Sequence, residues 1–156
     1  MRYSLVVLVV TFGLGSPASP QSVVPAKTDQ TAAIDFVQKA VPRALDYDQG
    51  NRQSLMDAEE DFTPDGWREF MKWLAGFLDD KGAPTGSSLF TATGAPVVKS
   101  IGKDAIRLAI PGTLKQSSYG GLSTTTYRVT VDVEVNGNAL KIQHLQTRTC
   151  LDKPCE

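Results

Sequence analysis

Few residues in this chain have the chemistry for acid and base catalysis. The chain has a single histidine, His144, and the pair Asp46 and Tyr47 adds a carboxyl and a phenol. Proton transfer needs a base, a group that orients it and a stabilised reacting atom, all within hydrogen-bond reach. Spacing alone assembles no such set, and a lone histidine on a mostly apolar strand is more often structural than catalytic. The residues therefore predict no catalytic site.

Cofactor and metal motifs are equally sparse. The carboxylates of DAEEDFTPD, residues 57–65, lack the Asp-x-Asp-x-Asp-Gly pattern that brings calcium ligands to one point. The segment YGGLSTTT, residues 119–126, contains no glycine pattern that leads into a helix and cradles phosphate, so it is interpreted as a loop or strand edge. A zinc site needs three or four ligands, and the histidine has no partner at a suitable spacing. We expect neither a cofactor nor a metal.

The two cysteines, Cys150 and Cys155, lie close together in TCLDKPCE at the C-terminus. The N-terminus holds an apolar run from Tyr3 to Gly15, followed by the small residues Ser16 and Ala18. This pattern predicts a signal peptide over residues 1–18, cleavage after Ala18, and a periplasmic or secreted protein with no stable membrane anchor. An uncleaved anchor stays open as the alternative. Export into an oxidising compartment predicts a disulfide between the two cysteines.

Charge is distributed unevenly along the chain. Cleavage after Ala18 removes Arg2 and leaves a net charge of −2, which gives no general reason to bind nucleic acid. Residues 19–80 hold six basic and twelve acidic residues, whereas residues 81–156 hold nine basic and five acidic residues. The two halves therefore differ in sign.

The acidic half has the periodicity of helices. Residues 19–30 show no periodicity and are predicted to be a flexible leader, followed by a single domain over residues 31–156. A first helix carries the stripe Ile34, Val37, Val41 and Leu45, with Pro42 expected to kink it, and Leu55 and Met56 indicate a short second helix.

A third helix begins in FTPDGWREFMKWLAGF, residues 62–77, where Thr63 can cap the helix and Pro64 suits its first position. Its apolar stripe is predicted to face the core and consists of Trp67, Phe70, Met71, Leu74, Phe77 and Leu78. Trp73 lies at the flank of this stripe. It is the aromatic residue of the segment that we expect to contact a partner.

The basic half has the period of strands. Tyr127, Val129, Val131, Val133 and Val135 alternate with polar residues, and a hairpin turn at residues 136–138 leads into a returning strand. A further strand is predicted to end at Pro111-Gly112, and another, over residues 89–101, is broken at residues 94–96. About three helices followed by about four antiparallel strands predict an α+β fold in which helices cover one face of a curved sheet.

The motif FTPDGWREF, preceded by ALDYDQGNRQSLMDAEED and followed by GAPVV, resembles the periplasmic domain of the DotI/IcmL family of type IV secretion and conjugation systems. Most of the resemblance lies in residues 40–76. It implies an NTF2-like cone and a scaffolding function without catalysis. Family members of the better-known type carry a transmembrane helix before the domain, whereas this chain has a cleavable signal. A soluble accessory protein of such a system is therefore expected.

The partners expected are proteins, including type IV secretion components, and homo-oligomerisation stays open. Partner contacts are predicted at Trp73, Arg128 and Lys141. NTF2-like cones also host isomerases and dehydratases, so a small-molecule-binding or isomerase-like protein that uses the cone pocket is the alternative.

Overall fold

The computed structural model describes residues 27–118 and 120–150. Helices precede strands, as predicted for an α+β fold. The helical elements are α1 (Lys27–Leu45), α2 (Arg52–Met56), η1 (Glu59–Asp61), α3 (Pro64–Leu74) and η2 (Ala75–Phe77). The strands are β1 (Ser87–Ala92), β2 (Val97–Ile101), β3 (Ala105–Ser118), β4 (Gly121–Asn136) and β5 (Ala139–Thr149). There is one strand more than predicted, because the interruption at residues 94–96 separates β1 from β2.

The N-terminal predictions fall mostly outside the described residues. The proposed signal peptide, residues 1–18, lies wholly outside them, and of the proposed leader only residues 27–30 are described. These four residues are helical, so α1 begins earlier than predicted. No helix in the described residues is long and apolar enough to cross a membrane.

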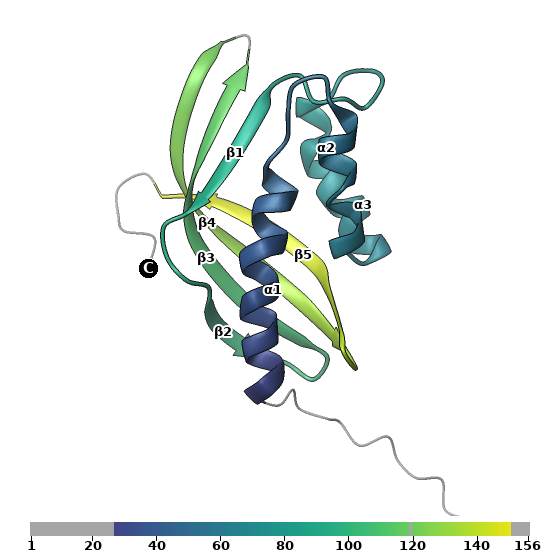
Figure 1. The fold of residues 1–156 in the computed structure, drawn as a ribbon, viewed down its shortest axis with the longest axis vertical. Coiled ribbons are helices and arrows are strands. Elements are labelled where there is room, and N and C mark those ends of the chain that lie inside the picture. Colours follow the sequence, from purple (N-terminus) through teal and green to yellow (C-terminus); the bar gives the residue numbers. More distant parts are fainter. Residues whose placement is uncertain (1–26, 119, 151–156) are drawn as a thin grey trace, which may run out of the picture.

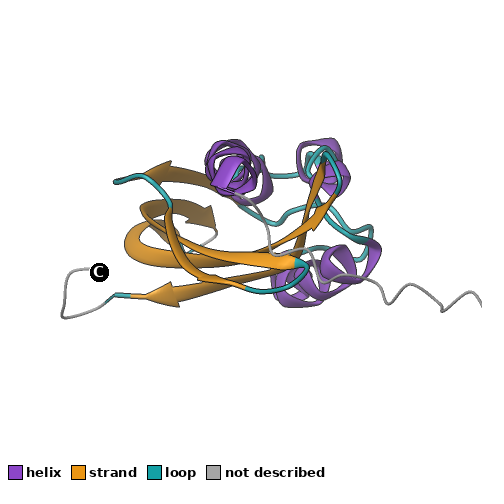
Figure 2. Cartoon of the chain, turned by 90° about the horizontal axis from the view of Figure 1, so that it is seen from below, coloured by secondary structure: helices purple, strands orange, loops and turns teal. Residues whose placement is uncertain are grey.

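All strands pair antiparallel in one sheet, in which β3 has β4 on one side and both β1 and β2 on the other. β5 pairs with the far side of β4. Figures 1 and 2 show α1 lying across one face of the sheet. α3 packs against β5, whereas α2 lies beside α1. Predicting the end of a strand at Pro111 was wrong, since β3 runs through it to Ser118.

Pro111 is tolerated inside β3 because the strand changes partner there. β2 pairs with β3 as far as Ala109, and β1 pairs from Gly112 onward. The Pro111 carbonyl accepts a hydrogen bond from the Thr93 amide, in the gap between β1 and β2. The proline nitrogen faces the same gap, where the ladder needs no N–H donor. Gly112 is needed beside it, because a Cβ atom there would lie 2.8 Å from the Thr91 carbonyl oxygen and would also overlap the Phe90 ring.

The core lies between α1 and the sheet. Val37, Val41 and Leu45 of the predicted α1 stripe are buried, and α1 continues through Pro42 to Leu45. They pack into one cluster with the inward-facing residues of the central strands, which include Ile106, Leu108, Ile110, Val129, Val131 and Val133. Alternation along β3 and β4 is therefore the pattern that positions the sheet against its helix.

The FTPDGWREF segment joins α3 to the edge of the sheet. The Thr63 hydroxyl accepts the Gly66 amide at 3.1 Å, which caps α3 as predicted, and the Thr63 amide donates to the Ile142 carbonyl of β5 at 2.9 Å. A Cβ atom on Gly66 would lie 2.7 Å from the Gln143 carbonyl oxygen and closer still to that of Ile142. The glycine thus lets the helix touch the backbone of β5.

Candidate functional site

A row of aromatic rings leads along α3 from the core to the surface. Phe62, Trp67 and Phe70 have neighbouring ring centroids 5.0–5.6 Å apart, and Trp73 and Phe77 continue the row at 5.8 and 6.2 Å. Phe70 is buried and Trp67 is half-buried against the core, whereas Trp73 is 43% exposed. The row therefore reaches the surface at Trp73.

Phe77 does not belong to the buried stripe in which it was predicted. It is 43% exposed and packs beside Trp73. The α-helix ends at Leu74 and the chain continues as the 3₁₀ turn η2, in which each residue turns further about the axis than in an α-helix. This change of period carries Phe77 off the stripe and enlarges the exposed aromatic surface.

Arg128, a predicted contact residue, lies on the sheet face opposite α1 and is directly opposite Arg148 of β5. Neither guanidinium forms an ion pair with any residue in the described part of the chain. Like charges directly opposite each other on neighbouring strands are destabilising. The sequence pattern shows that Arg128 faces away from the valines, but the pairing with Arg148 could be learned only from the register.

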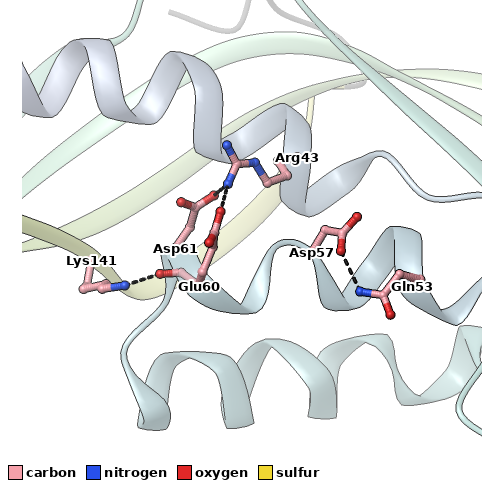
Figure 3. Close-up of polar contacts among 6 residues, drawn as sticks. All are labelled: Arg43, Gln53, Asp57, Glu60, Asp61 and Lys141. Atoms are coloured by element: carbon pink, nitrogen blue, oxygen red, sulfur yellow. Dashed lines mark hydrogen bonds and ion pairs between the residues drawn. The ribbon is translucent and has the colours of Figure 1, made fainter.

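Lys141, the third predicted contact residue, is held inside the molecule's own polar network. It donates a hydrogen bond to the Glu60 carbonyl, and Arg43 of α1 contacts the Glu60 and Asp61 carboxylates at 2.5 and 3.3 Å. Figure 3 shows this network, with Arg43, Glu60, Asp61 and Lys141 brought together from α1, η1 and β5. Burial raises the pKa of Asp61, and the charge of Arg43 opposes that rise. A substitution at Lys141 would therefore remove a contact within the fold as well as change the surface offered to a partner.

The residues considered for acid and base chemistry lie far apart in the topology. His144 is exposed on β5 and its Nδ1 lies 3.1 Å from a Glu69 carboxylate oxygen of α3. Asp46 and Tyr47 lie beside β1 at the opposite edge, with β3 and β4 between the two edges. The structure therefore does not combine these residues into one site.

Asp46 and Tyr47 line a groove of about 430 Å³ between the end of α1, β1 and the β3–β4 hairpin. The other lining residues include Ser54, Ser87, Leu89, Lys115 and Leu122. Burial raises the pKa of the Asp46 carboxyl, against the effect of the Phe90 amide that donates to it at 2.5 Å. Burial likewise raises the pKa of Tyr47. The groove could not be detected from the sequence, because it depends on long-range strand pairing.

The β1 and β5 edges of the sheet carry local caps that the sequence does not reveal. At the β1 edge, Tyr47 exchanges two backbone hydrogen bonds with Ser88, of 2.8 and 3.1 Å, and Asp46 accepts the Phe90 amide. At the β5 edge, Thr63 binds the Ile142 carbonyl and Gly66 lies against the backbone. Such caps protect edge strands from pairing with other chains.

Two further predictions concern a metal site and a disulfide. Within residues 27–118 and 120–150, no group of three or more His, Cys, Asp or Glu side chains is arranged to hold a metal ion. Cys150 is the last described residue, and Cys155 lies outside the described range. The disulfide between them stays a prediction.

No family model matches the chain, and no curated protein matches it by sequence. Solved structures do match it. An IcmL-like type IV secretion system protein from Legionella pneumophila superposes with a TM-score of 0.65 at 14% identity, over 86% of this chain and 99% of that one. The periplasmic domain of DotI gives 0.65 at 17% identity, over 77% and 95%. A periplasmic fragment of TraM gives 0.63 at 14% identity, over 78% and 98%.

The fold is DotI/IcmL-like. The predicted resemblance is confirmed at this level, with nearly the whole of each neighbouring chain covered. Identities of 14–17% show likeness of fold and leave the function of this chain to be argued from its own surface. The FTPDGWREF motif likewise reports on the fold, because its residues cap α3, stack in the core and dock the helix on β5.

Proposed function

We propose that this chain is a non-catalytic, exported protein-interaction domain that acts with a type IV secretion or conjugation apparatus, as a component or a soluble accessory. The observation that carries the proposal is the likeness of the whole described domain to three chains described as type IV secretion or periplasmic proteins. The signal-like N-terminus supports export, and the open sheet with helices on one face is compatible with an NTF2-like cone.

The surface of the domain supports binding of a protein. Trp73 and Phe77 form an exposed aromatic pair, and aromatic residues are enriched at the centres of protein interfaces. Arg128 and Arg148 form a separate basic pair that makes no ion pair in the described residues. A partner that covers either pair would bury aromatic surface or neutralise charge, which are the two usual sources of interface energy and specificity.

Affinity purification of the tagged protein from the periplasm of a strain with a type IV secretion system tests the proposal. The wild type should recover components of that system. Trp73→Ala and Arg128→Glu should each recover less while remaining folded, whereas His144→Ala should recover as much as the wild type. Recovery of no secretion component by the wild type, or turnover of a small molecule that His144→Ala abolishes, would overturn it.

Lys141 is not mutated in this experiment, and a charge reversal at Arg148 is used instead. Because Lys141 binds the Glu60 carbonyl, charge reversal there would confound loss of binding with loss of stability. Arg148 is exposed and forms no ion pair in the described residues, so Arg148→Glu is the better companion to Arg128→Glu.

A further inference from the structure

β4 extends beyond the end of β5 and, among the described residues, leaves a strand edge without a neighbour. β5 pairs with β4 from Tyr127 onward, and the Cys150 amide adds one bond to the Thr126 carbonyl at 3.0 Å. Residues 121–125 of β4 continue for five more positions with β3 on one side only. In Figure 1 the end of the β3–β4 hairpin accordingly projects beyond β5.

The register identifies which backbone groups of this edge are free. Thr126 faces β5, since its carbonyl accepts the Cys150 amide, and backbone direction alternates along a strand. The N–H and C=O groups of Leu122 and Thr124 therefore also face away from β3. They bond to nothing in the described part of the chain. A partner strand could take four backbone hydrogen bonds here.

This edge lacks the protection seen at the β1 and β5 edges. Tyr47 and Asp46 cap β1, and Thr63 and Gly66 cover β5, whereas the exposed segment GLSTT contains no charged residue, no proline and no covering element in the described residues. Leu122 is 76% exposed, more than any other large hydrophobic side chain described. Long, uncharged edges are the places where strands of other chains pair.

The charge around the edge is one-sided. Along the hairpin between Gly112 and Thr130 the sequence contains Lys115 and Arg128 and no acidic residue, and Arg148 of β5 lies opposite Arg128. Lys115 lines the same groove as Asp46 and Asp48. Neither arginine forms an ion pair in the described chain. An incoming strand with acidic side chains would offset their mutual repulsion.

We propose that residues 121–125 receive an extended segment of a partner protein, which adds to the sheet as a strand in line with β5 and presents acidic side chains to Arg128 and Arg148. This recognition mode combines affinity from main-chain hydrogen bonds with specificity from side chains. The proposal rests on the function proposed above and names the class of partner. Pairing with the same edge of a second copy is the competing occupant, and residues 121–125 of that copy contain no acidic side chain to face the arginines.

Two kinds of variant separate the backbone contribution from the charge. Thr124→Pro removes an outward-facing N–H without removing a bond to β3, and Thr124→Val is its matched control because it keeps the N–H and the branched side chain. Arg148→Glu reverses one charge beside the edge. Arg52→Glu is its control, because Arg52 is exposed on α2 and forms no ion pair in the described residues. Circular dichroism and urea melts of each variant establish that it is folded.

The probe is a ten-residue peptide that alternates valine or threonine with glutamate, titrated to millimolar concentration and followed by the amide NMR spectrum. We expect the shifts to concentrate at Leu122 and Thr124. Thr124→Pro should weaken binding at least tenfold and Thr124→Val less than twofold. Arg148→Glu should weaken binding at least threefold and Arg52→Glu should not. A peptide with lysine in place of glutamate, or one N-methylated along one edge, should bind at least threefold more weakly.

Other outcomes would overturn the proposal. These are shifts elsewhere or no shifts, equal binding by Thr124→Pro and the wild type, or a protein dimer in sedimentation that Thr124→Pro dissociates and the peptide does not displace. The periplasmic purification separates this failure from failure of the proposed function. If the wild type recovers secretion components and Thr124→Pro recovers them equally, the strand-edge proposal alone is wrong. If the wild type recovers none, the proposed function is wrong.

Discussion

The junction of α3 with β5 and the free end of the β3–β4 hairpin differ in what their sequences reveal. The junction has a distinctive motif with a structural role, whereas the hairpin end has a plain sequence and the proposed binding edge. The junction contains the distinctive FTPDGWREF motif, which stabilises the fold through a helix cap, a close backbone approach and an aromatic stack. The hairpin end is GLSTTT, an unremarkable sequence, and it carries the open edge. A sequence motif can therefore identify a fold while the surface for a partner lies where the sequence is plain.

Replacing Trp67 should have the largest effect on the junction. Its ring contacts both Phe62 and Phe70, so Trp67→Ala should lower the free energy of unfolding by about 3 kcal/mol. This value is near the lower end for a buried aromatic residue because Trp67 is only half-buried. Trp73→Ala should lower it by about 1 kcal/mol or less, since that side chain is 43% exposed. Urea melts measure both values. Equal losses would show that the aromatic row is not graded from core to surface.

The fold class was predictable because period and capping are local signals. Alternating valines in β4 and the Thr63-Pro64 helix start were identified from sequence and lie as expected. The length of β3 was not predictable. A proline normally ends a strand, and β3 passes Pro111 only because it changes partner there from β2 to β1. Phe77 was misplaced because nothing in the sequence marked the change from α to 3₁₀ geometry.

The candidate sites were less predictable than the fold for the same reason. Trp73 could be found from helical phase, and Arg128 from strand alternation. The Arg128–Arg148 pair, the groove at Asp46 and the open edge at residues 121–125 each depend on which strands become neighbours and in which register. A single sequence without structure does not specify those pairings.

Gly66→Ala should destabilise the junction by about 2 kcal/mol, because a Cβ atom would overlap the backbone of β5 and force α3 away from it. Alanine favours helix by about 1 kcal/mol over glycine, which reduces the loss but does not reverse it. Gly76→Ala is the matched control, since a Cβ atom there would meet nothing within 4 Å. Chemical denaturation of both should show a loss at Gly66 alone, and a neutral Gly66→Ala would contradict the close approach.

Asp46→Asn should alter the pH dependence of stability at the capped β1 edge. Burial raises the pKa of Asp46 above its ordinary value of 3.8, so the folded state binds this proton more tightly than the unfolded state. Ionisation as pH rises from 3.8 through the raised value therefore reduces stability. The asparagine variant avoids this loss and should gain stability relative to the wild type between pH 3 and pH 7.

Asp79→Asn provides the control of opposite sign. The amides of Ala83 and Lys81 lower the pKa of Asp79, so its contribution is present above 3.8 and is lost as pH falls through the lowered value. This variant should lose stability relative to the wild type as pH rises over the same range. Urea melts at several pH values measure both differences. Parallel profiles for the two variants would contradict the assigned causes.

The smallest effect on stability is expected at the hairpin end, where Leu122→Ser should change the free energy of unfolding by no more than about 0.5 kcal/mol. Leu122 is 76% exposed and packs against little, whereas Leu114, on the opposite face of the same hairpin, is 4% exposed and belongs to the core. Leu114→Ala should therefore cost about 2 to 4 kcal/mol. If Leu122→Ser also weakens binding of the glutamate peptide, the exposed face of the hairpin serves a partner while its inner face holds the fold. A large loss of stability for Leu122→Ser would instead show that the hairpin end is packed, and the contrast with the junction would disappear.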